Sequence, residues 1–166
     1  QSGGESKIVS APAVHNEMIR RRPDLVAELT ADMFWTKHGE VVPGEDPWYR
    51  MAVFNYLDGY LTTAGGYKHI EKGHALPGNP PLTAAQMEAF ALMAEVNEEL
   101  HLSMEFEIGD IQLLNSHVTM HWPAPEKRRR LWRLWLHNKE IRPRPDAFGH
   151  RTGGIRTPQT ILRVTT

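Results

Sequence analysis

Cysteine is absent from the 166 residues of this chain. Disulfide bonds, thiolate catalysis and cysteine-ligated metal sites are therefore excluded within it. No apolar run approaches the roughly 18 residues that a membrane-spanning helix needs, and no signal-peptide pattern opens the sequence. We therefore expect a cytoplasmic protein with no membrane partner. The formal net charge is only −1, which gives no global attraction to nucleic acid.

The length of the chain predicts one domain spanning residues 1–166, because a chain of this size can bury a substantial core. The first residue is Gln1 rather than methionine, so we expect the coding sequence to extend further upstream. Nine histidines keep imidazole metal ligands under consideration.

Helical and strand patterns occupy different parts of the chain. Residues 6–10 read as a strand, and helices are expected over residues 11–22, capped by Ser10, and residues 23–34. A hairpin is expected over residues 48–63, because Asp58 and Gly59 form a favoured two-residue turn. Thr83 is expected to cap the longest helix.

The second half changes to a period of two. Residues 102–115 predict two strands around a turn at Gly109–Asp110, and "HVTMH", "RRRLWRLWLHN" and, more weakly, "TILRV" predict three more. Helices followed by strands indicate an α+β fold, mainly β in its core, with a mostly antiparallel sheet.

Two histidines of "NSHVTMH", His117 and His121, lie four residues apart. Val118 and Thr119 favour a strand here, on which the two rings share a face about 13 Å apart at ~3.3 Å per residue. One ion cannot bind both, so at most one is a ligand of a given metal. The alternative is that both are ordinary hydrogen-bonded or exposed histidines.

The His-x-acid pairs at His15–Glu17 and His69–Glu71 imitate an iron-binding motif. Side chains two apart converge on a strand but diverge on a helix. Both pairs are predicted to be helical, so we interpret neither as an iron site.

Arg133 lies in the middle of the apolar stretch "LWRLWL". A buried guanidinium is stable only when it is paired, because its desolvation costs several kcal/mol. Its planar fork suits a carboxylate. The partner is either an internal acid, Glu105 or Glu107, or the carboxylate of a bound ligand. The basic run at residues 127–130 is interpreted as a solvated turn rather than a nucleic-acid site.

Several stretches together resemble the C-terminal part of the TauD/TfdA (taurine dioxygenase-like) family of Fe(II)- and 2-oxoglutarate-dependent oxygenases. The specific motifs are "GDIQLLN" followed by a histidine and "RRRLWRLWL"; "SGGES", "GEVVPGEDPWYRMAVFNYLDGYLT" and "GGIRTPQT" support them. The resemblance implies a double-stranded β-helix, or jelly roll, with flanking helices, Fe(II) and 2-oxoglutarate as cofactors, and O₂ and a small organic molecule as substrates.

The resemblance also assigns roles to four residues. His121 falls on an iron-binding histidine, and Arg133 falls on the arginine that holds the distal carboxylate of 2-oxoglutarate. Arg129 matches a second basic position near the co-substrate, and Ser6 matches the hydroxyl residue that assists the same carboxylate. His117 matches no ligand.

The His-x-Asp motif that supplies the other two iron ligands in this family lies upstream of the "SGG" stretch, and this chain contains neither that motif nor the N-terminal part of the fold. The segment after His121 is also shorter than in relatives. Two functions are therefore carried forward. One is a dioxygenase, as part of a longer polypeptide, with a complementing chain or as a homo-oligomer. The other is a non-catalytic jelly-roll fragment that binds a small carboxylate or a partner chain.

Overall fold

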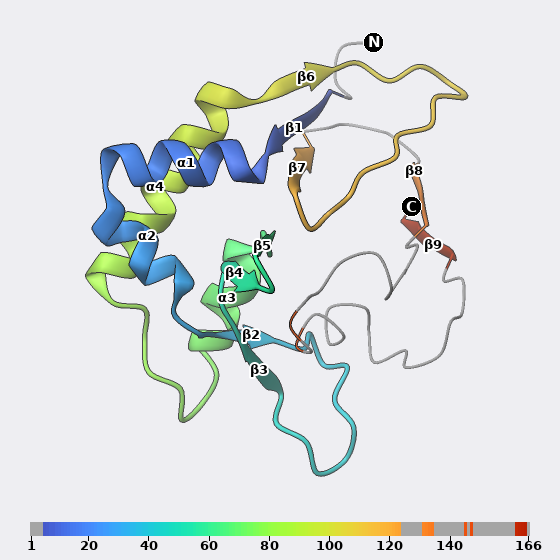
Figure 1. Ribbon diagram of the computed structural model, residues 1–166. Coiled ribbons are helices and arrows are strands. Elements are labelled where there is room, and N and C mark those ends of the chain that lie inside the picture. Colours follow the sequence, from blue (N-terminus) through green and yellow to red (C-terminus); the bar gives the residue numbers. More distant parts are fainter. Residues whose placement is uncertain (1–4, 124–130, 135–144, 146, 148–161, 166) are drawn as a thin grey trace.

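The computed structural model describes residues 5–123, 131–134, 145, 147 and 162–165 of this chain. Helices and strands are mixed, as the sequence predicts (Figure 1). The elements follow one another as β1 (Ser6–Ser10), α1 (Ala11–Arg21), α2 (Pro23–Thr30), β2 (Met33–Thr36), β3 (Trp48–Met51), β4 (Phe54–Leu57), β5 (Tyr60–Thr63), α3 (Tyr67–His74), α4 (Ala84–Leu100), β6 (Leu102–Met104), β7 (Thr119–Pro123), β8 (Leu131–Leu134) and β9 (Leu162–Thr165).

The strands form several small antiparallel sheets. β1 is the central strand of a three-stranded sheet of order β6-β1-β7. The other pairs are β2 with β3, β4 with β5, and β8 with β9. The strands that the structure describes do not close into a barrel, so the jelly roll stays an expectation from the family resemblance.

Helices α1 and α4 begin where the sequence predicts, each at a residue whose side chain caps the first turn. The Ser10 hydroxyl accepts a hydrogen bond from the Ala13 N–H at the start of α1. At the start of α4, Thr83 and Gln86 form a reciprocal capping box, with N···O distances of 3.1 and 3.0 Å. The box at α4 satisfies two backbone N–H groups that a helix start would otherwise leave unpaired, and the Ser10 cap satisfies one.

The hydrophobic core lies where α1, α2 and α4 pack on one another, and it extends through β1 and β2–β4 to α3. The buried stripe of α4 consists of Ala89, Phe90, Met93 and Val96. Met87, Ala91 and Ala94 of the same helix are exposed.

Two predicted elements have different bounds. The second helix ends at Thr30 instead of continuing to residue 34, because Met33–Thr36 forms strand β2 and pairs with β3. The predicted hairpin is confirmed in its second half, where Asp58 and Gly59 have φ angles of 50° and 79° and join β4 to β5. Its first run, β3, pairs with β2 instead.

The predicted strands over residues 102–115 are largely wrong. Only Leu102–Met104 is a strand, and residues 111–115 are irregular. The strand carrying His121 begins at Thr119, after a turn in which the N–H groups of Val118 and Thr119 donate to the Asn115 carbonyl. His117 therefore lies in a turn, and the argument that it shares a strand face with His121 does not hold.

Candidate functional site

Two of the predicted site residues lie on the same face of the β6-β1-β7 sheet. In the β1–β7 register Ile8 is directly opposite His121, and Ser6 is opposite Pro123. Side chains at alternate positions of a strand point to one face, and directly opposed residues share it. Ser6, Ile8 and His121 therefore share one side of the sheet, with Ser6 and His121 offset by two positions on neighbouring strands.

The opposite side of this sheet belongs to the helical core. Val9 and its partner Met120 are buried in that core. Lys7 points the same way and its ammonium pairs with Glu98 of α4 at 2.7 Å. The helices thus pack against the face of the sheet that carries Lys7, Val9 and Met120, and the face that carries Ser6 and His121 points away from them.

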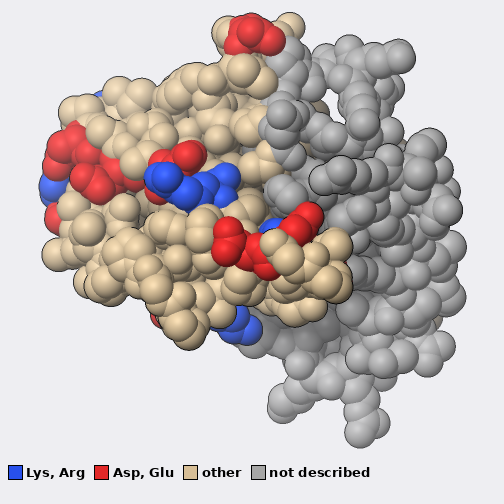
Figure 2. Space-filling view, turned by 90° about the horizontal axis from the view of Figure 1, so that it is seen from below, with Lys and Arg blue, Asp and Glu red and all other residues tan. Residues whose placement is uncertain are grey.

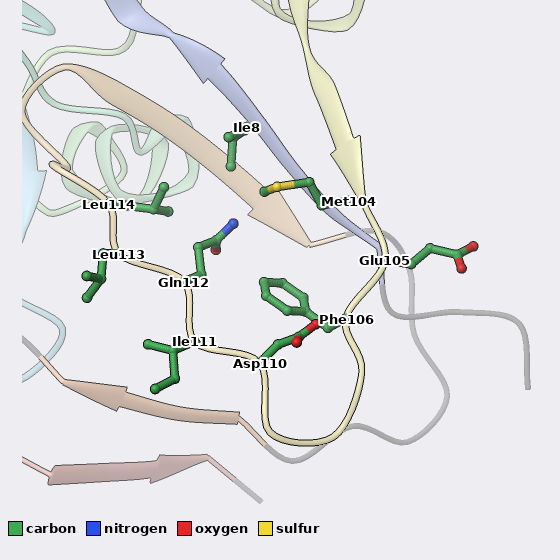
Figure 3. A pocket seen from close by; sticks show the side chains of 9 residues that line it. All are labelled: Ile8, Met104, Glu105, Phe106, Asp110, Ile111, Gln112, Leu113 and Leu114. Carbon is green, nitrogen blue, oxygen red and sulfur yellow. The ribbon is translucent and has the colours of Figure 1, made fainter.

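An open cavity of about 370 Å³ lies on the side of the sheet that carries Ser6 (Figure 3). Gln112 reaches from the loop of residues 105–118 towards Ile8 and Met104. Its Oε1 accepts a hydrogen bond from the Ser6 hydroxyl at 3.3 Å. The Ser6 side chain is buried, and a ligand that used this hydroxyl would replace Gln112 as its partner.

The described residues that line this cavity carry negative charge but no positive charge. Glu105 and Asp110 are its ionisable members. Asp110 Oδ2 is already occupied, because it accepts the Glu107 N–H at 2.8 Å. An anionic ligand at this face would therefore need a cation from elsewhere in the protein.

Arg129 and Arg133 are candidates for this cation, but only the family resemblance assigns them the role. Arg133 lies in β8 and is opposite Arg163 of β9; its side chain lies outside the described residues, and so does Arg129 altogether. The roles of both arginines, and the choice between an internal acid and a ligand as partner of Arg133, stay predictions.

The described residues do not by themselves form an iron site. No group of three histidine, aspartate or glutamate side chains in this part of the chain is close enough to hold a metal. Iron oxygenases of this kind use two histidines and one carboxylate, and His121 supplies at most one of the three. The described residues therefore do not make up the complete metal centre of the family.

The His15–Glu17 and His69–Glu71 pairs lie in helices, as predicted: His15 in α1 and His69 in α3. The His15 ring is buried, with Nε2 against the Tyr56 hydroxyl and its face near Phe54. The Glu17 carboxylate accepts hydrogen bonds from Arg20 and Arg21. The helical geometry thus separates each histidine from its acid.

Sequence reasoning missed two other histidine contacts. His38 Nε2 lies 2.5 Å from His69 Nδ1, with the rings nearly perpendicular. His74 uses both ring nitrogens, because Nε2 accepts the Phe34 N–H at 3.2 Å and Nδ1 donates to the Pro80 carbonyl at 2.7 Å. The His38–His69 and Phe34–His74 pairs are 31 and 40 residues apart in sequence, so no local motif could have indicated those two contacts.

Large pKa shifts occur in a charge cluster between α1 and α4. Hydrogen bonds from Arg20 and Arg21 lower the pKa of Glu17 to about 2. A hydrogen bond from Arg21 also lowers the pKa of Glu99. On the face shown in Figure 2, acidic and basic side chains lie next to one another. This pattern is typical of a solvent-exposed network of ion pairs, which here links α1 to α4.

None of the helices that the structure describes combines the length and apolarity needed to cross a bilayer.

Over residues 1–135 the sequence matches the family described as "Taurine catabolism dioxygenase TauD, TfdA family". The chain belongs to the TauD/TfdA family. FR-33289 synthase of Streptomyces rubellomurinus is 31% identical over 167 residues, covering 91% of this chain and 48% of that protein. Taurine hydroxylase-like protein SAT17 of Stachybotrys chartarum is 33% identical over 125 residues, covering 72% of this chain and 31% of that protein.

The TauD/TfdA chain thus spans about half the length of the first relative and a third of the second. The matched residues 1–135 include Ser6, His121, Arg129 and Arg133. Membership confirms the resemblance drawn from "GDIQLLN" and "RRRLWRLWL", and it supports an oxygenase class.

Proposed function

We propose that this chain is part of an Fe(II)- and 2-oxoglutarate-dependent dioxygenase that uses O₂ to hydroxylate a small organic molecule. The observation that carries the proposal is the register that puts Ser6 and His121 on one sheet face, in a chain that belongs to this family. The name of one relative, a taurine hydroxylase-like protein, agrees with oxidative chemistry.

Each proposed site residue has a role that its chemistry suits. The neutral imidazole of His121 offers a nitrogen lone pair to Fe(II). The guanidinium of Arg133 binds the distal carboxylate of 2-oxoglutarate through two parallel hydrogen bonds, with Arg129 adding positive charge. Ser6 donates its hydroxyl to the same carboxylate in place of Gln112. These residues bind and orient the co-substrate, which places the reacting groups for the metal.

The other metal ligands come from a polypeptide outside this chain. The described residues contain no three-ligand group, and the His-x-Asp motif of the family lies upstream of the segment that this chain resembles. Activity therefore requires a completing polypeptide. The family membership favours this role over that of a carboxylate-binding fragment without catalytic activity.

The test uses a fusion protein in which the part of FR-33289 synthase that has no counterpart in this chain precedes Gln1. With Fe(II), O₂ and 2-oxoglutarate, this fusion protein is expected to form succinate, whereas the isolated chain is not. His121→Ala in the fusion should reduce Fe(II) affinity by more than the ~10–100-fold typical of losing an outer-shell partner.

His101→Ala is the matched control, because His101 lies at the end of α4, away from the Ser6 face, and its ring bonds the Glu98 carbonyl. It should leave succinate formation unchanged. If the fusion protein binds 2-oxoglutarate but His121→Ala has no more effect than His101→Ala, the proposed iron role is wrong and the carboxylate-binding alternative gains support.

A further inference from the structure

Two imidazole rings from separate elements meet at the surface beside β2. His38 lies in the loop that follows β2, and His69 lies in α3. The Nε2 atom of His38 is 2.5 Å from Nδ1 of His69, and the two ring planes are inclined at 83°. Both residues are exposed, so ions from solvent have access to this pair of nitrogens.

A tight turn holds His38 in an uncommon backbone conformation. His38 and Gly39 have φ angles of 54° and 81°. Across them, the Glu40 N–H donates a hydrogen bond to the Lys37 carbonyl at 3.0 Å. The His38 N–H also donates to the hydroxyl of Thr36, a buried residue at the end of β2, at 3.1 Å. A left-handed backbone at a residue other than glycine carries strain, and such positions cluster at functional sites.

Helix α3 holds His69 at a fixed position relative to β2, against which it packs (Figure 1). At the start of the helix, a Cβ on Gly66 would lie 2.9 Å from the Trp35 ring. Within its last turn, a Cβ on Gly73 would lie 2.2 Å from the Phe34 carbonyl oxygen. The helix therefore touches the strand closely near both ends. Because the same strand leads into the turn before α3, packed elements and not long loops bring the two rings together.

Two facing imidazole nitrogens are a ligand pair for a divalent transition metal. Neutral imidazole binds Zn²⁺, Cu²⁺ and Ni²⁺. Zinc–nitrogen bonds are ~2.0–2.1 Å long, so two nitrogens that share one tetrahedral ion lie about 3.3 Å apart. The rings reach this spacing when their nitrogens separate by less than ~1 Å, which rotation of two exposed side chains provides. The ring that donates the hydrogen bond then carries its proton on its other nitrogen.

The charges near the two rings allow a cation to bind. The Lys37 ammonium, next to His38 in sequence, is paired with the Glu45 carboxylate at 2.9 Å. Lys68 and Lys72 of α3 are exposed, where water and salt screen their repulsion of a cation. The described residues add no third histidine or acid to the pair. We therefore expect weaker binding and faster exchange than at a structural zinc site with four protein ligands.

We propose that His38 Nε2 and His69 Nδ1 bind one divalent transition metal ion, with water completing its coordination. The bound ion joins the turn after β2 to α3. This inference goes beyond the oxygenase function, because both ligands belong to this chain and no completing polypeptide takes part. It also differs from the His-x-acid pattern of the sequence, since the Glu71 carboxylate contacts the Tyr67 hydroxyl of the same helix at 3.4 Å.

Nitrogen NMR of the imidazole rings tests the assignment on the native chain. Zn²⁺, added after a chelator has removed other metals, should shift the signals of His38 Nε2 and His69 Nδ1 and reach saturation at one ion per chain. Mg²⁺ at the same concentration should shift neither signal, because it takes oxygen ligands. Coordination through the opposite ring nitrogens, or no shift at these two rings, would overturn the proposal.

His38→Asn and His69→Gln each remove one ligand while preserving the local backbone. Asparagine, like histidine, tolerates a left-handed conformation, and glutamine is a good helix former. Two linked ligands bind ~10²–10⁴-fold more tightly than one, so each variant should raise the Kd for Zn²⁺ by at least ~100-fold in titration calorimetry. His101→Ala is the matched control, because the His101 ring bonds the Glu98 carbonyl at the end of α4; it should leave Kd unchanged.

Thermal unfolding gives a second readout. Saturating Zn²⁺ should raise the Tm of the native chain, because an ion that binds the folded state stabilises it, and should raise the Tm of neither ligand variant. Unchanged Zn²⁺ affinity in His38→Asn and His69→Gln, or an equal loss in His101→Ala, would place the ion elsewhere and overturn the site. None of these measurements depends on succinate formation, so this proposal and the oxygenase function can fail separately.

Discussion

Ile8 of β1 lies directly opposite His121 of β7. Because Ser6 is two residues from Ile8 on the same strand, this pairing places the proposed iron ligand and the proposed co-substrate hydroxyl on one face of one sheet. The helices cover the other face through Val9 and Met120. A rigid sheet supported by a packed core can hold two site residues in a constant relationship, as precise positioning requires.

Ser6→Ala should weaken co-substrate binding in the fusion protein. Loss of one neutral hydrogen bond donor costs ~0.5–1.5 kcal/mol, so we expect KM for 2-oxoglutarate to rise by roughly 2–10-fold with little change in kcat. Ser6→Thr keeps the hydroxyl and should restore KM. Ser103→Ala is the matched control, because Ser103 is opposite Lys7 and faces the other side of the sheet; an equal rise in KM there would contradict the role of Ser6.

Gly73→Ala should destabilise the isolated chain. A Cβ at Gly73 would lie 2.2 Å from the Phe34 carbonyl oxygen, because α3 approaches the backbone of β2 at this point. Overpacking of this kind costs ~1–3 kcal/mol or more, which outweighs the gain of up to about 1 kcal/mol in helix propensity. Urea unfolding measures the difference.

Gly65→Ala is the control for that measurement. A Cβ at Gly65 meets only the flexible Met120 side chain, at 3.7 Å, and should be accommodated. Equal stability of Gly73→Ala and Gly65→Ala would show that α3 does not lie as close to β2 as described.

Glu17 should give a stabilising contribution that is lost in acid. Arg20 and Arg21 lower its pKa from 4.5 to about 2 in the folded protein. A lowered folded-state pKa means that the contribution is complete above pH 4.5 and disappears as the pH falls towards 2. The Tm difference between the native chain and Glu17→Gln should therefore be constant above about pH 5 and shrink below pH 4.5.

The Glu17 side chain is partly exposed, at 21% of its surface, so the effect should be small and weaken with added salt. Glu71→Gln is the control: its carboxylate is the acid of the second His-x-acid pair and contacts only the Tyr67 hydroxyl. A Tm difference for Glu17→Gln that does not vary between pH 5 and pH 2 would contradict the ion cluster.

Elements with local determinants could be predicted from the sequence. The caps at Ser10 and Thr83 and the turn at Asp58–Gly59 depend on a few neighbouring residues, and all three are confirmed. The strand predicted over residues 111–115 failed because a strand also needs a neighbour to bond, which no local pattern specifies. The early end of α2 also depends on a distant partner, because Met33–Thr36 pairs with β3 as a strand instead of continuing the helix.

The candidate site was predicted through motifs rather than geometry. "SGGES" and "NSHVTMH" led to Ser6 and His121, and the register then placed both on one face. No sequence pattern revealed that Gln112 is the partner of Ser6 or that His74 joins α3 to the Phe34 backbone. Those contacts arise from the folding of distant segments onto one another.

Binding of 2-oxoglutarate to the fusion protein, measured by titration calorimetry for Arg133→Ala and Arg50→Ala, tests the central claim most directly. Hydrogen bonds to a charged group contribute ~1.5–3 kcal/mol each, so losing the two from Arg133 should raise Kd by at least about 100-fold. Arg50→Ala, which removes an exposed guanidinium near Phe34, should leave Kd unchanged. Equal Kd values for the two variants would contradict the assignment of Arg133 to the co-substrate carboxylate.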